Sequence, residues 1–207
     1  MNRSALVAIT LLIAVALGLG GRYFFSGEEA RQGSTTGVST IASSLIGGPF
    51  EMIDHNGKTV TQASYAGRYM VVYFGYTFCP DVCPLGLQLI GEALDIFAEK
   101  GGELAKVTPI FVTVDPERDS PEILKEYLSN FHPAFIGLSG SVEQMTRMAK
   151  AYRVYYAKVK DETSSAEYLM DHTAITYLMG PDGGYVGHFS HSATADKMAA
   201  KFLQAIK

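Results

Sequence analysis

The sequence predicts an α/β domain, because strand patterns and helix patterns alternate along most of the 207-residue chain. The only two cysteines, Cys79 and Cys83, lie where an apolar strand pattern changes into a helical pattern. Towards the C-terminus, two strand patterns joined by a glycine-rich turn precede a final helix pattern. A βαβ unit followed by ββα, with a cysteine pair at the first strand-to-helix turn, is typical of a thioredoxin-like fold. Here we expect that fold to carry an additional N-terminal β-hairpin.

The first 25 residues predict one transmembrane helix that serves as a membrane anchor. Residues 5–21 are apolar except for Thr10, and as a helix they would span about 26 Å, near the lower limit for crossing a bilayer. A cleaved signal peptide is the alternative, but the small residues Ala14 and Ala16 lie inside the apolar run rather than after it. The short anchor and the lack of an Arg/Ser-rich transit segment favour a single pass through the bacterial inner membrane, with the remaining chain on the periplasmic side.

Residues 26–44 predict a flexible linker, because this Gly/Ser/Thr-rich segment cannot bury a core. The globular domain is expected over residues 45–207. It opens with a β-hairpin around Asn56-Gly57, a pair in which both residues tolerate positive φ. Two cysteines cannot form a disulfide framework, so the domain must rest on a hydrophobic core.

The centre of the domain is predicted to be a strand over residues 68–76, whose apolar run without alternation indicates burial on both faces. The helix that follows, residues 85–100, ends at Gly101-Gly102. A second buried strand covers residues 107–114 and completes the βαβ unit.

The next two helices have clear N-terminal signals. Ser120 is an N-cap followed by proline at the first position of the helix over residues 121–130. Ser141 begins a capping box for the helix over residues 142–152. A short strand, residues 135–138, is expected between these helices.

The C-terminal part is predicted to contain a strand over residues 155–160, a polar loop over 161–167, and a hairpin of strands 174–179 and 185–190. The final helix, residues 194–206, places apolar side chains on one face.

Cys79 and Cys83 are separated by three residues, whereas thioredoxin-type redox sites have two. Because Pro80 and Pro84 disfavour helical backbone at the residues before them, we expect a turn over Cys79–Cys83 and a helix that starts at Pro84. Free amide groups and the helix dipole at such a junction favour thiolate over thiol. Both thiols would face one opening, where they either form a disulfide or bind a soft metal ion.

A metal ion held by two thiolates needs a third donor, and His172 is the candidate that its position favours. It lies directly before the strand 174–179, and in a thioredoxin fold the residue that enters this strand faces the cysteine turn. Thioredoxins have a cis-proline there, which this sequence lacks. Two thiolates and one imidazole suit copper, whereas zinc would require a fourth ligand. The other histidines are expected in an exposed turn, in a loop, or at the last strand: His55, His132, His188 and His191.

Several segments together resemble the SCO/SenC family over the chain from Phe50 onwards. They are Tyr76–Pro84, Asp115–Pro121, Asp171–Thr173 and Tyr177–Gly183. The resemblance implies a thioredoxin-like fold that binds copper, as Cu(I) or Cu(II), through Cys79, Cys83 and His172. It also implies a role in assembling the binuclear copper A centre of cytochrome c oxidase subunit II.

Two carboxylates flank the expected ligands. Asp81 lies between the cysteines and Asp171 adjoins the histidine. They could orient the imidazole or recognise a partner, and the alternative is that they only solvate a turn and cap a helix.

These observations favour a membrane-anchored metallochaperone with a copper acceptor and a thioredoxin-like reductant as partners. The alternatives are a thiol-disulfide reductase that keeps the acceptor cysteines reduced, and a redox sensor. A peroxiredoxin-type peroxidase would need a threonine three residues before its reactive cysteine, and Tyr76 occupies that position. An electron-transfer copper protein would need an axial ligand, for which Met170 is only a weak candidate. The net charge of −4 and the absence of basic runs argue against nucleic-acid binding.

Overall fold

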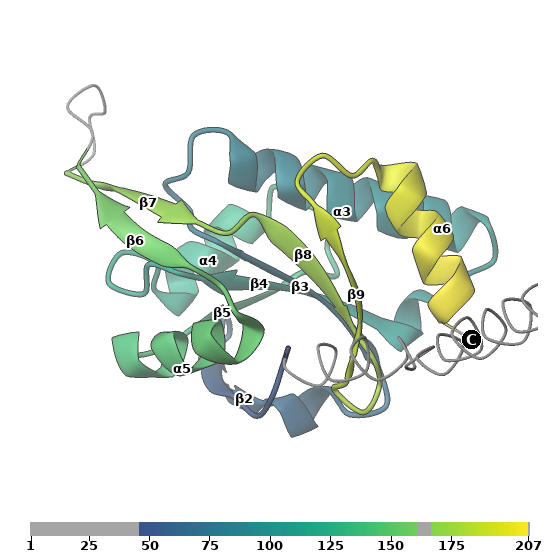
Figure 1. Ribbon diagram of the computed structural model, residues 1–207, viewed down its shortest axis with the longest axis horizontal. Coiled ribbons are helices and arrows are strands. Elements are labelled where there is room, and N and C mark those ends of the chain that lie inside the picture. Colours follow the sequence, from purple (N-terminus) through teal and green to yellow (C-terminus); the bar gives the residue numbers. More distant parts are fainter. Residues whose placement is uncertain (1–45, 161–166, 207) are drawn as a thin grey trace, which may run out of the picture. The chain divides into compact units, whose positions relative to one another are not determined.

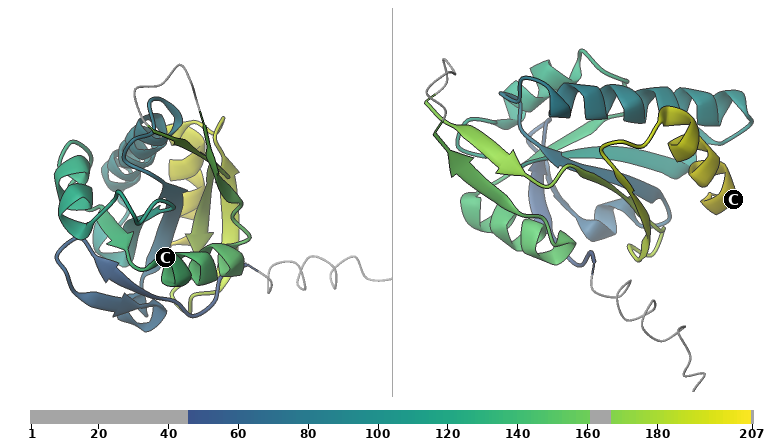
Figure 2. Two further views of the ribbon diagram at one scale, coloured as in Figure 1. Left: turned by 90° about the vertical axis from the view of Figure 1, so that its left-hand side faces the viewer. Right: turned by 45° about the horizontal axis from the view of Figure 1, so that its top comes forward.

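The computed structural model describes residues 46–160 and 167–206, which form a seven-stranded sheet with helices on both faces (Figures 1 and 2). The strand order is β2-β1-β5-β4-β3-β8-β9. The central strand β3 (Tyr69–Gly75) pairs parallel with β4 (Val107–Thr113) and antiparallel with β8 (Ile175–Met179). The other strands of this sheet are β1 (Glu51–Asp54), β2 (Thr59–Thr61), β5 (Ile136–Ser139) and β9 (Tyr185–Ser190). The α/β class and the N-terminal hairpin of β1 and β2 are therefore confirmed.

The α-helices of the described residues correspond to the predicted ones, apart from the start of the first, whereas the short 3₁₀ helices were not predicted. The α-helices are α3 (Val82–Glu99), α4 (Pro121–Leu128), α5 (Val142–Tyr152) and α6 (Ala195–Ala205), and the 3₁₀ helices are η1 (Gln62–Tyr65) and η2 (Leu104–Lys106). Figure 1 shows α3 and α6 on one face of the sheet and α5 on the other. Ser120 caps α4 by accepting a hydrogen bond from the Ile123 amide, and Ser141 forms the predicted capping box of α5.

The core is centred on β3 and β4. Every residue of β4 is buried, and only Tyr69 of β3 is partly exposed, as the lack of alternation predicts. On the face covered by α5, Phe74 packs against Tyr152 and Tyr177, with ring centroids 5.4 and 6.3 Å away. This packing fixes the carboxyl end of β3, where the cysteine segment begins.

The start of α3 differs from the prediction. The helix begins at Val82, so Cys83 lies in its first turn and Pro84 is the third helical residue, not the first. Amide groups in the first turn have no intrahelical acceptor, so a proline there costs no hydrogen bond. Cys83 is thus helical in spite of the bias that the following proline exerts on its backbone.

A two-stranded ribbon, β6 (Tyr156–Val159) and β7 (Leu169–His172), stands apart from the main sheet. The strand β6 was predicted, but β7 was not, because its two polar C-terminal residues carry no strand pattern and no turn signal separates them from β8. His172 consequently ends β7 opposite Tyr156, instead of leading directly into β8.

The predicted anchor (residues 1–25) and linker (residues 26–44) lie outside the described residues. Within the part of the chain that is described, no helix is long and apolar enough to cross a membrane.

Candidate metal centre

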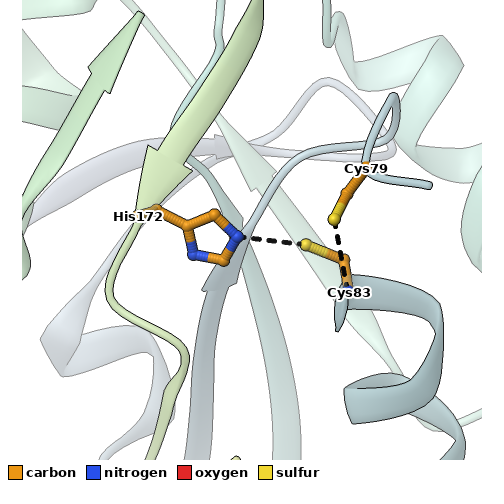
Figure 3. A group of neighbouring side chains, drawn as sticks. All are labelled: Cys79, Cys83 and His172. Carbon is orange, nitrogen blue, oxygen red and sulfur yellow. Dashed lines mark hydrogen bonds between the residues drawn. The ribbon is translucent and has the colours of Figure 1, made fainter. Parts of the chain in front are cut away.

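Cys79, Cys83 and His172 converge although they come from three different segments (Figure 3). Their possible ligand atoms all lie within 4.8 Å of one another. Cys83 Sγ and His172 Nε2 are 3.3 Å apart although the residues are separated by 89 positions. Among residues 46–160 and 167–206, this is the one group of three or more Cys, His, Asp or Glu side chains that could hold a metal ion.

Cys83 is held in place by the core. Its side chain is fully buried at the start of α3, against the last residue of β3. A Cβ atom added at Gly75 would lie 2.8 Å from Cys83 Sγ and 2.7 Å from Phe111 Cε2. Glycine is therefore required at position 75 for the thiol to occupy this place.

Cys79 lies half-buried in the loop before α3, and its environment favours the thiolate. Its Sγ accepts a hydrogen bond from the Cys83 backbone N–H at 3.4 Å, so the sulfur satisfies an amide that the helix leaves free. A hydrogen bond from the Cys83 side chain outweighs burial and, with backbone hydrogen bonds from Asp81 and Cys83, lowers the pKa of Cys79 to about 3. The same hydrogen bond to Cys79, together with burial, raises the pKa of Cys83. Without metal, the pair is therefore one half-buried thiolate and one buried thiol.

His172 presents its Nε2 atom to the thiols. Its Nδ1 atom lies 3.4 Å from the carbonyl oxygen of Thr173, which suits a proton on Nδ1. That tautomer leaves the Nε2 lone pair free to bind a metal ion. The Tyr76 ring stands edge to face with the imidazole at 5.8 Å and limits its rotation.

Asp119 anchors the loop that carries Cys79. Its carboxylate is fully buried and accepts hydrogen bonds from the Thr77 amide at 3.0 Å and from the Thr77 hydroxyl at 2.6 Å. The Thr113 hydroxyl, at the end of β4, donates to the same carboxylate at 2.6 Å. Burial raises the pKa of Asp119, against the effect of these hydrogen bonds. The loops that follow β3 and β4 are thereby tied together beside the thiols.

Asp81 and Asp171 are both exposed and line a cleft of about 240 Å³ that opens onto Cys79 and His172. Asp81 is the N-cap residue of α3, although its side chain makes no capping hydrogen bond. The two carboxylates thus border the opening through which a partner would reach the thiols.

The remaining histidines lie away from this group. His55, expected to be exposed, is instead half-buried: its Nδ1 accepts a hydrogen bond from the Gly137 amide at 2.9 Å, and burial lowers its pKa. His132 lies 3.5 Å from the Asp95 carboxylate, and His188 is exposed beside Tyr185. None of them is part of the three-residue group.

The sequence reasoning missed the supporting role of the loop after β4. In the sequence, Asp115 and Asp119 stand out only as members of the segment Asp115–Pro121 that carries the family resemblance, and no supporting role follows from it. The usable signal was topological, because β3 and β4 are parallel and their carboxyl ends meet at one edge of the sheet. Any polar residue directly after β4 therefore lies next to the cysteine loop.

The donor set is chemically suited to copper. Thiolates and imidazole are the ligands that favour soft or borderline ions, and three such donors are sufficient for Cu(I). Zinc in a structural site would require a fourth protein ligand, which the group does not offer.

Comparison with known proteins places this site in a family. The model of the SCO1/SenC family matches residues 38–207. A SCO2-like protein of Rickettsia prowazekii is 34% identical over 202 residues, which cover 97% of both chains. Arabidopsis thaliana ScoI, crystallised with copper bound, is 40% identical with a TM-score of 0.73, and the match covers 77% of this chain and 97% of that one.

A more distant structure is that of BsSco, in which a disulfide switch was identified and which is described as a member of the Sco family of cytochrome c oxidase assembly proteins. It is 25% identical with a TM-score of 0.59, and the match covers 76% of this chain and 91% of BsSco. These matches confirm the predicted thioredoxin-like α/β fold of the described domain.

Proposed function

This chain belongs to the SCO1/SenC family, and from that premise we propose that it binds copper as its cargo and serves the assembly of cytochrome c oxidase. The observation that carries the proposal is the convergence of Cys79 Sγ, Cys83 Sγ and His172 within 4.8 Å. The copper bound to the related ScoI and the membership of the related BsSco in a family of cytochrome c oxidase assembly proteins support it.

The copper acceptor is the binuclear copper A centre of cytochrome c oxidase subunit II. The site is suited to giving up its ion because it combines a buried donor with an accessible one. Cys83 is buried, whereas Cys79 and His172 line an open cleft. An incoming acceptor thiolate can replace the accessible donors while Cys83 still holds the ion. Binding requires thiolates, so the ion displaces the proton of Cys83.

A thiol-disulfide reductase is the second candidate, favoured by the asymmetry of the two thiols. The Cys79 thiolate would attack an acceptor disulfide, forming a mixed disulfide and releasing one acceptor thiolate. Cys83, after losing its proton, would then attack the Cys79 sulfur and release the second thiolate. Two electrons pass to the acceptor, the pair becomes a disulfide, and a thioredoxin-like dithiol must reduce it again.

Copper titration of the purified, reduced chain tests the proposal. We expect Cys79→Ser and Cys83→Ser to abolish binding, and His172→Ala to weaken it by at least about 100-fold, since loss of a mere supporting residue already costs about 10- to 100-fold. His188→Ala, an exposed histidine outside the group, is the control and should bind as the wild type does. A wild type without copper affinity, or a His172→Ala variant with unchanged affinity, would refute the copper site.

Cytochrome c oxidase assembly in cells separates the two candidates. Copper carriage requires His172, so His172→Ala cells should lack the copper A centre. A reductase requires only the thiols, and would leave His172→Ala cells with normal oxidase.

We further propose that residues 1–25 anchor the chain in the bacterial inner membrane and that residues 26–44 let the domain reach its acceptor on the periplasmic side. The apolar run over residues 5–21 supports this proposal. A fusion of residues 1–25 to alkaline phosphatase should be active, because that enzyme folds only after export. An inactive fusion would contradict the proposed topology.

A further inference from the structure

The position of His172 depends on contacts other than the ladder of the main sheet. It ends β7, whose hydrogen-bonded partner is β6, and this ribbon is separate from the seven-stranded sheet. The thiols, in contrast, follow directly from the central strand β3. Something must therefore hold the ribbon against the cysteine loop, because the metal centre exists only when the two meet.

Arg118, in the loop after β4, contacts both the ribbon and the cysteine segment. Its Nη1 donates to the Tyr168 carbonyl oxygen, directly before β7, at 2.9 Å, and its Cζ lies 3.8 Å from the centre of the Tyr168 ring. The same guanidinium lies 5.2 Å from the Phe78 ring and 5.9 Å from the Tyr76 ring in the cysteine segment. Planar stacking of this kind is a property of arginine that lysine does not share.

A buried carboxylate also holds the Arg118 guanidinium in place. Its Nε donates to the carboxylate of Asp115, which is almost completely buried. The Tyr168 hydroxyl donates to the other oxygen of that carboxylate at 2.9 Å. Arg118 Nη2 is buried and has no hydrogen-bond partner among the described residues.

We propose that Arg118 is a positioning residue that clamps the His172 strand to the cysteine loop and thereby sets the approach of the imidazole to the two thiols. Asp115 supports the guanidinium from the buried side. The guanidinium contacts the Tyr168 ring of the ribbon on one hand and the Phe78 and Tyr76 rings of the cysteine segment on the other. Arg118 touches none of the three donors, and acts through Tyr168, which is four residues from His172 on the same strand segment. The inference rests on the proposed copper site for its effect on affinity, but the clamp itself is a property of the metal-free chain.

Hydrogen exchange of the metal-free chain tests the clamp directly. We expect Arg118→Gln to accelerate exchange at residues 168–172, while residues 69–75 in β3 keep their protection, because only the ribbon loses a contact. Arg68→Gln is the matched control, since Arg68 also stacks on a tyrosine, Tyr65, at 6.0 Å, but outside the metal centre. Unchanged exchange at residues 168–172 in Arg118→Gln would overturn the proposal.

Loss of Arg118 also leaves the buried Asp115 carboxylate without its cation, which can cost enough stability to unfold the domain. A second variant, Tyr168→Leu, removes the stacked ring and keeps the ion pair. It should accelerate exchange at residues 168–172, but less than Arg118→Gln does, because the hydrogen bond from Arg118 to the backbone carbonyl of residue 168 remains. An unchanged rate would count against the clamp.

Competition for Cu(I) with bicinchoninate tests the consequence for the metal centre. Arg118→Gln should lower the affinity by about 10- to 100-fold, as the loss of supporting contacts commonly does. Arg118→Lys should not restore it, because lysine keeps the charge but not the planar fork. In a His172→Ala background, Arg118→Gln should have no further effect, because it acts through the histidine.

Each other result has a defined meaning. Full affinity in Arg118→Lys would show that Arg118 acts only as a charge, and an undiminished effect in the His172→Ala background would show that it acts on the thiols. Either result overturns the positioning role. A wild type that binds no Cu(I) refutes the proposed function instead, and the exchange measurement then decides the clamp.

Discussion

The two thiols and the imidazole are held by regions of very different construction. The cysteine arm comprises β3, the loop up to residue 81 and the first turn of α3. It continues from an almost completely buried central strand of the sheet, which lies between β4 and β8. The histidine arm, the ribbon of β6 and β7, has only one strand partner for each strand. Backbone ladders and a packed core position the first arm, whereas side-chain contacts position the second.

The difference indicates that the thiols are fixed and the imidazole is adjustable. Opening the cysteine arm requires disruption of the central sheet, whereas moving the ribbon costs fewer buried contacts, chiefly those of Met170 and the stacking at Arg118. A protein that takes up and releases an ion needs a donor that can move. Here that donor is the His172 imidazole, which lies on the ribbon, the less firmly held of the two elements. Variants in the cysteine arm should therefore change global stability, and variants in the histidine arm should change mainly the local protection of the ribbon.

The largest effect is expected from Asp119→Ala in the support of the cysteine arm. The change leaves the Thr77 amide and the buried Thr113 hydroxyl without their acceptor. Unsatisfied buried donors cost about 1–3 kcal/mol each, so the free energy of unfolding should fall by about 3 kcal/mol. Denaturant unfolding measures this loss. In the control Asp54→Ala, two amides of an exposed turn also lose their acceptor, but water can replace it. An equal fall in the free energy of unfolding in this control would contradict the importance of burial.

A smaller but still global effect is expected from Gly75→Ala. The new methyl group would overlap with Cys83 Sγ and the Phe111 ring, at 2.8 and 2.7 Å. Overpacking of this kind costs about 1–3 kcal/mol and should displace the thiol, so that copper binding weakens together with stability. Gly187→Ala is the control, because its added methyl would meet Lys201 Cε at an ordinary 3.7 Å. Equal stability of the two variants in thermal unfolding would contradict the close packing at the thiol.

The same contrast explains what the sequence could predict. The cysteine arm follows from local signals: an apolar run, a cysteine pair with a defined spacing and a helical pattern. The histidine arm does not, because β7 is short, polar at one end, and stabilised by pairing with a strand ten or more residues away. His172 was identified from its place in the fold and not from a strand pattern around it.

Supporting residues were hardest to predict for a related reason. In the sequence, Arg118 and Asp119 are indistinguishable from ordinary polar loop residues that precede the N-cap Ser120. Their contacts with Tyr168 and Thr77 span 50 and 42 positions and appear only when the parallel strands bring their ends together.

A local effect is expected from Thr173→Val in the histidine arm. The Thr173 hydroxyl accepts a hydrogen bond from the Tyr155 amide at 3.1 Å and closes the base of the ribbon next to His172. Its loss should cost about 0.5–1.5 kcal/mol, confined to the ribbon. Hydrogen exchange should accelerate in β7 and remain unchanged in β3. Thr59→Val, on the exposed edge of the main sheet, should leave β7 unaffected. Faster exchange in β3 would show that the two arms are one cooperative unit.

The smallest effect is expected from Lys158→Gln, which separates an exposed contact of the ribbon from a buried one. Lys158 lies 4.4 Å from the Tyr168 ring, on which Arg118 also stacks, and pairs with Glu117. Both charges of that pair are about half exposed, so water and salt screen it. We expect an unchanged unfolding midpoint and unchanged exchange in β7, at low salt and at high salt alike. If Lys158→Gln loosened β7 as much as Arg118→Gln does, any cation beside Tyr168 would hold the ribbon, and the buried support from Asp115 would have no special part in placing His172.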